Sequence, residues 1–187
     1  MDRRRAGGVA LFCALAVPAL RAQGDEVSIC YNYGCYARAP VNYSEAQLER
    51  LHQALAAAAD AKAEREAISA VIGRMYAIAG EQTPVWRDKG GNYADGGENG
   101  KMDCIDHSTN TSAFLRLLEA RGWLRFHDVL QPVMRRRLLI SEHWAARIRE
   151  RQTQAVYVVD SWFFDNGHPA LVLPVKDWLA GKTPRVW

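Results

Sequence analysis

Three residues in the second half of the chain have side chains that together can perform thiol chemistry: Cys104, His143 and Asp160. A cysteine becomes a nucleophile when a nearby base takes its proton, and histidine serves most often as that base. A carboxylate beside the imidazole fixes its tautomer and stabilises its protonated form. The sequence therefore predicts a Cys–His–Asp site, with Cys104 as nucleophile, His143 as base and Asp160 as the orienting group.

The residues around Cys104 predict that it opens a helix. Asp103 is a typical N-cap, Asp106 completes a capping-box pattern, and apolar residues at helical spacing continue to Gly122. The positive end of the helix dipole favours a thiolate at this position. The two neighbouring carboxylates oppose it and raise the thiol pKa, so a nearby imidazolium is needed to settle the thiolate.

Two strand patterns predict how His143 and Asp160 meet. Residues 141–149 and 154–163 are rich in β-branched and aromatic side chains, and the residues between them can form a hairpin. His143 lies near the start of the first strand and Asp160 near the end of the second. An antiparallel pair therefore brings them side by side. A third strand is expected at 170–175, after a tight turn.

Each of these residues also has a purely structural interpretation. Cys104 can be an inert buried thiol, His143 a core or edge histidine, and Asp160 a residue that only ends a strand. His107 is a rival base, because side chains three positions apart on a helix are neighbours. The carboxylates that the sequence places near His107 are those of the helix cap.

The N-terminal segment and the cysteines predict export and one disulfide. Residues 1–22 have the basic start, short apolar stretch and small final residue of a secretory signal peptide, and the alternative is an uncleaved anchor. Disulfides persist outside the cytosol, and the short loop between Cys30 and Cys35 favours their pairing over free thiols or a metal pair. Removal of residues 1–22 takes away Cys13, so Cys104 is then the odd cysteine, either reactive or intermolecular.

Composition argues against nucleic-acid binding and against a membrane span. The chain has 24 basic and 21 acidic residues, and removing the four arginines and one aspartate of residues 1–22 leaves 20 of each sign. The short basic run at 135–137 is expected to be a solvated loop or helix face rather than a binding stripe. After the signal peptide, no stretch is long and apolar enough to cross a bilayer. A periplasmic or secreted protein without stable membrane insertion is therefore expected.

Residues 23–187 are expected to form one domain, because about 165 residues suffice for a single sizeable core. Residues 24–43 are expected to be extended and irregular. Two helices, at 44–59 and 62–79, should precede a long loop at 81–101. Glycine pairs in that loop lack the strand–glycine–helix context of a phosphate-binding loop, so no nucleotide site is expected.

These motifs resemble the transglutaminase-like branch of the papain-fold thiol enzymes, which includes periplasmic cysteine proteinases of bacteria. The resemblance covers residues 100–181 and includes Asp-Cys-x-Asp at 103–106, His-Trp at 143–144 and Val-Val-Asp-Ser-Trp at 158–162. The spacing of the three site residues is also similar. The resemblance implies an α+β fold, with N-terminal helices and a Cys-bearing helix packed on an antiparallel sheet. It also implies acyl transfer through a thioester.

The resemblance leaves other parts of the site open. The backbone N–H of Cys104 is one expected oxyanion donor, and Trp86 or Gln82 is a candidate for the second. Some bacterial relatives bind calcium near the nucleophile, and Asp103 and Asp106 are the candidates here. Calcium takes roughly six to eight oxygen ligands, and the sequence contains no ligand loop. No other cofactor is expected.

The predicted function is hydrolysis of a peptide or isopeptide amide, with a protein or peptide as substrate. A lysine amine in place of water as acceptor would make the chain a transglutaminase, although excess water favours hydrolysis unless the site excludes it. A non-catalytic binding module on the same scaffold is an alternative from another class. A redox protein that uses Cys30 and Cys35 is a further alternative, although their spacing departs from Cys-x-x-Cys.

Overall fold

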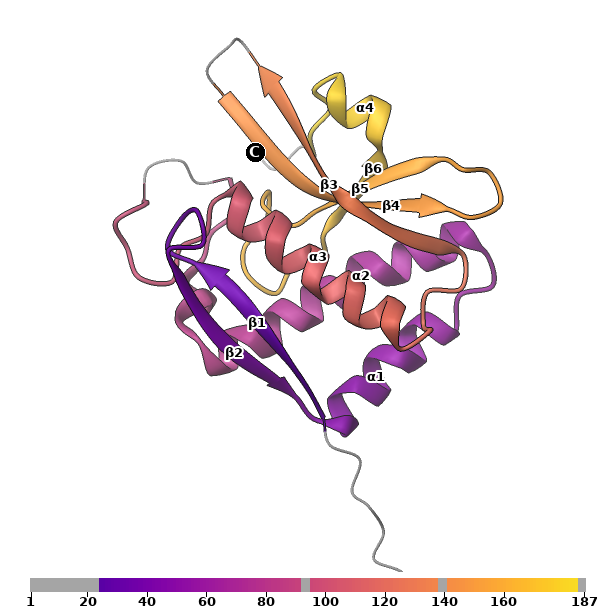
Figure 1. Ribbon diagram of the computed structural model, residues 1–187, viewed down its shortest axis with the longest axis horizontal. Coiled ribbons are helices and arrows are strands. Elements are labelled where there is room, and N and C mark those ends of the chain that lie inside the picture. Colours follow the sequence, from indigo (N-terminus) through magenta and orange to yellow (C-terminus); the bar gives the residue numbers. More distant parts are fainter. Residues whose placement is uncertain (1–23, 92–94, 138–140, 185–187) are drawn as a thin grey trace, which may run out of the picture.

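The computed structural model describes residues 24–91, 95–137 and 141–184, so the predicted signal peptide lies outside the described residues. In the described part, two antiparallel sheets and four α-helices form an α+β fold, as the sequence predicts (Figure 1). No helix of that part is long and apolar enough to cross a membrane.

The elements follow one another in a simple order. A hairpin of β1 and β2 comes first, then α1, α2 and a short 3-10 helix η1, then α3, four strands and α4. Their bounds are β1 Asp25–Tyr31, β2 Ala37–Tyr43, α1 Glu45–Ala56, α2 Ala61–Gln82, η1 Pro84–Arg87, α3 Cys104–Ala120, β3 His127–Arg137, β4 Ser141–Glu150, β5 Val156–Asp160, β6 Leu171–Pro174 and α4 Val175–Leu179. The three predicted helices and the three predicted strands after residue 140 are all present, with shifted ends.

The first hairpin confirms that residues 24–43 are largely extended and corrects the expectation that they are irregular. β1 and β2 pair antiparallel over their whole length. Val27 and Ile29 are buried and Glu26 and Ser28 are exposed, while Cys30 is buried as part of the disulfide. This alternation is the period-two pattern of a half-buried strand. The sequence did not predict a regular hairpin, because the alternation is short and the tyrosines that follow β1 do not continue it.

The basic run at 135–137 is also corrected: it belongs to strand β3, not to a loop or helix face. Arg135 is only 7 % exposed. Its guanidinium lies over the ring of Trp178, 4.3 Å from the centroid, and donates to the carbonyl oxygen of the same residue. Trp178, which is distant in the sequence, therefore buries the guanidinium of Arg135, which the sequence alone suggests is solvated.

Helix α3 lies between the two sheets (Figure 1). The four-stranded sheet, in the order β3-β4-β5-β6, is covered on both faces. Ala146 and Val159 face the main core, which includes side chains of α3, whereas their neighbours Ala145 and Val158 pack with Trp178 of α4. Successive residues of a strand point to opposite faces, so α3 and α4 cover opposite faces of this sheet.

A buried carboxylate ties α2 to the start of β3. Glu64 is fully buried and accepts hydrogen bonds from the N–H groups of Arg125 and Phe126, at 2.7 and 3.0 Å, and from Nδ1 of His127 at 2.9 Å. Burial alone would raise the pKa of Glu64, but these bonds lower it below its ordinary value. The segment that leads into the sheet is therefore anchored by one side chain.

Replacing this carboxylate should destabilise the fold. Glu64→Ala leaves two backbone N–H groups and an imidazole without their acceptor, and we expect a loss of about 3 kcal/mol in the free energy of unfolding. Urea denaturation followed by tryptophan fluorescence measures it. Glu66→Ala, two positions away and paired with Lys62 on the surface, should change stability by less than about 0.5 kcal/mol. Equal effects of the two substitutions would contradict the anchoring role.

Candidate active site

The imidazole of His143 and the carboxylate of Asp160 form a buried pair. Nε2 of His143 lies 2.7 Å from Oδ2 of Asp160, and the two residues are 8 % and 2 % exposed. The pair joins β4 to the last residue of β5, in the way that the predicted hairpin requires. Because the Nε2 proton is directed at the carboxylate, Nδ1 is the ring nitrogen that can accept a proton.

Aromatic side chains and two further donors fix this pair in place. The indole Nε1 of Trp178 donates to Oδ2 of Asp160 at 2.9 Å, and the N–H of Trp162 donates to Oδ1 at 3.2 Å. The rings of Trp162, Phe163 and Trp178 surround His143, with centroids 4.8, 5.4 and 5.5 Å from its own. Both carboxylate oxygens have partners, so the imidazole is held in one orientation.

The sulfur of Cys104 lies against the main chain on either side of His143. It is 3.8 Å from the carbonyl oxygen of Glu142, and the N–H of Trp144 donates to it. β5 pairs with β4 only over Ala146–Arg149 and leaves this part of the β4 edge uncovered. The carbonyl of one residue and the N–H two positions later point to the same edge of a strand. The sulfur of Cys104 therefore takes the position on the β4 edge that a further residue of β5 would occupy if the pairing continued.

Cys104 is held as a neutral thiol. Burial raises its pKa above the ordinary value, the N–H of Trp144 lowers it, and the carboxylates of Asp103 and Asp160 raise it again. The thiol points to the carbonyl oxygen of Glu142 rather than to the imidazole. Any reaction at this sulfur must then remove its proton during the chemical step rather than start from a preformed thiolate.

His107, the rival base, is bound into a separate buried network. Its Nε2 lies 2.9 Å from Oδ2 of Asp88, and its Nδ1 lies 2.8 Å from Oγ of Ser161. Ser161 also contacts Oγ1 of Thr111 at 3.0 Å and the hydroxyl of Tyr76 at 3.3 Å. The orienting carboxylate is thus Asp88 rather than the helix cap that the sequence suggested. Because both ring nitrogens are engaged, this network fastens α3 to the end of β5.

Cys30 and Cys35 form the predicted disulfide, and Cys104 is a free thiol. The loop that the disulfide closes has left-handed backbone at Asn32 and Tyr33, with φ of 66° and 60°. Side chains other than glycine make this conformation costly, so contacts with the rest of the protein are needed to hold it. The loop finds those contacts at the start of α3.

The two acidic residues at the start of α3 form its capping box, as predicted. Asp103 accepts from the N–H of Ile105 through Oδ1 and from the N–H of Gly34 through Oδ2, both at 3.0 Å. Asp106 accepts from the N–H of Cys35 at 2.6 Å through Oδ1 and from the N–H of Asp103 at 3.3 Å through Oδ2. All four carboxylate oxygens therefore bind backbone donors from the helix start and from the disulfide loop.

This arrangement does not fit a metal ion. Calcium takes roughly six to eight oxygen ligands, and each oxygen of Asp103 and Asp106 would have to release a backbone N–H to bind it. Among the described residues, one group has metal-ligand spacing: Cys30, Cys35 and Asp106, whose ligand atoms lie within 4.8 Å of one another. Both of its sulfurs belong to the disulfide, which leaves no thiolate to coordinate an ion.

The structure places the two oxyanion candidates elsewhere. Gln82 exchanges two hydrogen bonds of 2.9 Å with the main chain of Asn42, and the exposed ring of Trp86 stacks with Arg87. Within the described residues, no contact joins either of them to the thiol. The donor that does reach the sulfur is the N–H of Trp144, which sequence reasoning missed because it depends on where β5 leaves β4.

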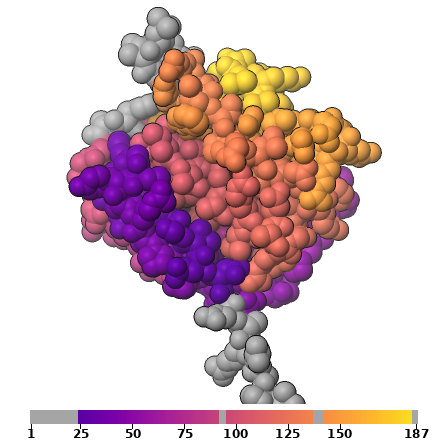
Figure 2. Space-filling model, in the orientation of Figure 1, coloured from indigo at the N-terminus to yellow at the C-terminus, as the bar shows by residue number. Residues whose placement is uncertain are grey.

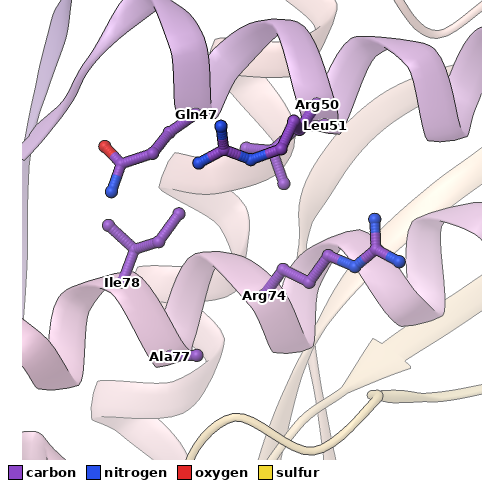
Figure 3. Close-up of a pocket in the computed structure, with 6 residues that line it drawn as sticks. All are labelled: Gln47, Arg50, Leu51, Arg74, Ala77 and Ile78. Carbon is purple, nitrogen blue, oxygen red and sulfur yellow. The ribbon is translucent and has the colours of Figure 1, made fainter.

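A shallow groove of about 430 Å³ lies between α1 and α2, away from this site (Figure 3). It is lined by Gln47, Arg50, Leu51, Arg74, Ala77 and Ile78. None of the three predicted site residues lines it. We therefore assign no part of the thiol chemistry to this groove.

Comparisons with protein-family models, with curated proteins and with solved structures found no match for this chain. The resemblance to transglutaminase-like enzymes thus depends on the sequence motifs alone. The geometry of Cys104, His143 and Asp160 is the remaining ground for a functional proposal.

The cap carboxylate of Asp106 should make stability depend on pH. Burial raises its pKa to about 6, well above the value of about 3.9 expected in the unfolded chain. The folded protein holds this proton more tightly, so the stabilisation is fully present below about pH 4 and is lost as the pH rises through about 6. In Asp106→Asn this dependence should disappear. Between pH 4 and pH 7 the free energy of unfolding of the variant should therefore increase by roughly 2–3 kcal/mol relative to that of the wild type. Urea denaturation at several pH values measures the difference, and a constant difference would contradict the buried, proton-holding carboxyl.

The pH dependence of Cys104 alkylation should show that the thiol is neutral at pH 7. Because burial and two carboxylates raise its pKa, the rate with iodoacetamide should increase with pH and reach its midpoint above the ordinary thiol pKa of about 8.5. Mass spectrometry of the peptide that contains Cys104, after labelling of the folded protein under non-reducing conditions, follows the reaction. The urea-unfolded protein provides the control, with an ordinary midpoint. A folded midpoint near pH 6 would mean that an imidazolium already stabilises the thiolate.

Proposed function

We propose that the protein is an exported thiol enzyme, similar to the transglutaminase-like branch, that cleaves a peptide or isopeptide amide. The observation that carries the proposal is that the buried His143–Asp160 pair and the sulfur of Cys104 meet at the same stretch of β4. The imidazole belongs to His143, and the sulfur contacts the main chain of Glu142 and Trp144 on either side of it. The imidazole has one nitrogen committed to a carboxylate and the other available as a base. Nucleophilic catalysis by a thiol requires an oriented base of this kind close to the sulfur.

In the proposed reaction, Nδ1 of His143 takes the proton of Cys104 while the sulfur attacks the carbonyl carbon of the amide. A C–S bond forms, and the carbonyl oxygen becomes an oxyanion. The imidazolium then gives its proton to the amide nitrogen, the C–N bond breaks, and the amine leaves a thioester on Cys104. Water attacks the thioester with the same base, which releases the acid and restores the thiol. Asp160 stabilises the imidazolium throughout and remains ionised.

The neutral thiol is compatible with this sequence of steps. A thiol whose pKa is raised by burial is a poor nucleophile until a base takes its proton, so the base has to act in the same step. The N–H of Trp144, which donates to the sulfur, would stabilise the charge that develops there. Under this proposal the site keeps its nucleophile unreactive until a substrate displaces the contact with Glu142.

The fold and the disulfide support the rest of the proposal. A Cys-bearing helix lies against an antiparallel sheet that carries the histidine and the carboxylate on neighbouring strands, as the resemblance implies. A disulfide between Cys30 and Cys35 fits a compartment where thiols are oxidised. We propose that the enzyme acts in the periplasm or outside the cell, on a protein or peptide substrate.

Substitutions at the site should separate catalysis from folding. Cys104→Ala should abolish cleavage of fluorescently labelled casein, and His143→Ala should lower kcat/KM by roughly 10²–10⁴-fold because general base catalysis is lost. His168→Ala, which changes an exposed histidine, should keep wild-type activity. Thermal unfolding checks that each variant folds. If folded Cys104→Ala retains turnover, Cys104 is not the nucleophile, and a wild type without turnover or thioester formation would favour a binding module.

The acceptor is tested by adding methylamine to the same assay. A peptidase releases new carboxyl termini with or without the amine, because water resolves the thioester. A transglutaminase incorporates methylamine into glutamine side chains, with loss of ammonia. Mass spectrometry of the casein fragments distinguishes the two. Incorporation of the amine without peptide cleavage would replace hydrolysis by transamidation as the proposed reaction.

A further inference from the structure

A groove of about 540 Å³ opens directly beside Cys104, between α3 and the hairpin of β3 and β4. In Figure 2 the surface of this hairpin, in orange, borders that of α3, in pink. Seven residues line the groove: Ile105, Ser108, Thr109, Gln131, Pro132, Glu142 and Trp144. Its volume lies within the range of about 300–1,000 Å³ that is typical of ligand pockets.

The groove is continuous with the thiol. Ile105 follows Cys104 in the chain, and the main chain of Glu142 and Trp144 contacts the sulfur. The side chains of the same two strand residues line the groove, on the face opposite to His143. A substrate whose carbonyl carbon is at the sulfur therefore has neighbouring atoms over the groove.

The local structure of α3 and of β3 leaves both walls of the groove accessible. Ile105, Ser108 and Thr109 form one helical stripe, and Ile105 is 42 % exposed although it is large and apolar. On the other wall, the pairing of β3 with β4 is interrupted between Leu130 and Val133, so Gln131 and Pro132 leave the ladder. Such irregularities are frequent beside active sites, where they redirect side chains.

The groove carries no unpaired charge. The carboxylate of Glu142 is bound by Nε and Nη2 of Arg136, at 2.9 and 2.6 Å. The hydroxyl of Ser108 donates to the carbonyl oxygen of Ile105. What remains for a ligand is the apolar surface of Ile105, Pro132 and Trp144, together with the uncharged polar side chains of Thr109 and Gln131. A charged side chain placed there would lose hydration without finding an unpaired opposite charge.

We propose that this groove is a specificity pocket, which binds an uncharged, apolar side chain of the peptide substrate next to the carbonyl that Cys104 attacks. The inference rests on the proposed function and adds the substrate class to it. Binding an aliphatic side chain here holds the carbonyl at the sulfur, so the preference appears in the rate of reaction at Cys104.

Three acetylated aminoacyl chloromethyl ketones, built on glycine, leucine and aspartate, test the pocket without a known substrate. In each, the sulfur of Cys104 attacks the chloromethyl carbon, a C–S bond forms, chloride leaves and His143 takes the thiol proton. The second-order rate of labelling is followed by intact mass, and peptide mapping assigns it to Cys104. We expect the leucyl probe to react at least about tenfold faster than the other two.

Two variants locate the preference. Pro132→Glu puts a charge on the wall farthest from the Cys104 helix and should reduce the advantage of the leucyl probe to less than about threefold. Leu179→Glu adds the same charge at an exposed apolar residue of α4 and should keep the wild-type ratio. An unchanged ratio in folded Pro132→Glu, or its loss in Leu179→Glu, overturns the assignment of the groove.

The results that would refute the specificity pocket differ from those that would refute the thiol enzyme. Equal rates of the three probes at Cys104 in the wild type overturn the specificity pocket but leave the proposed thiol chemistry in place. If none of the probes labels folded protein faster than urea-unfolded protein at the same pH, the site does not activate Cys104. Both proposals then fall together.

Discussion

The candidate site depends on the point where β5 stops pairing with β4. The ladder covers Ala146–Arg149 of β4 and then ends, because the chain turns away after Asp160. A carbonyl and an N–H of β4 are left on that edge, and burying them without partners would cost free energy. The sulfur of Cys104 contacts both groups. The same strand end thus places the carboxylate on the imidazole and makes room for the thiol.

This constraint explains why much of the polar bonding lies around one short segment. The N–H of Trp162 and the indole of Trp178 hold the carboxylate of Asp160, while Ser161 binds the His107 network on α3. The two networks come from neighbouring residues that point to opposite sides of the strand end. A change at this turn would therefore move the thiol helix and the imidazole together, so the geometry of the site and the packing of α3 on the sheet cannot vary independently.

The parts that the sequence predicted well are those with local signals. The capping boxes at Ser44 and Asp103 and the disulfide depend on residues only a few positions apart, and the β4–β5 hairpin needs a short connection. The pairing of His143 with Asp160 followed from that hairpin. Strand β3 and the partner of His107 were missed, because Arg135 needs Trp178 and His107 needs Asp88 to be buried at low cost. Neither partner is marked by spacing along the chain.

The protonation of Cys104 gives the clearest case where long-range structure outweighs a local signal. The helix start favours a thiolate by roughly 0.3–1 kcal/mol, as for other charges at exposed helix ends. Packing against β4 removes water from the sulfur, and desolvation acts in the opposite direction with a larger effect, so the pKa rises. Since β4 approaches from 38 residues away, no pattern around Cys104 could reveal it. Strand β4, which carries His143, thus also keeps the Cys104 thiol neutral. In the proposed mechanism this requires proton transfer and attack to be coupled.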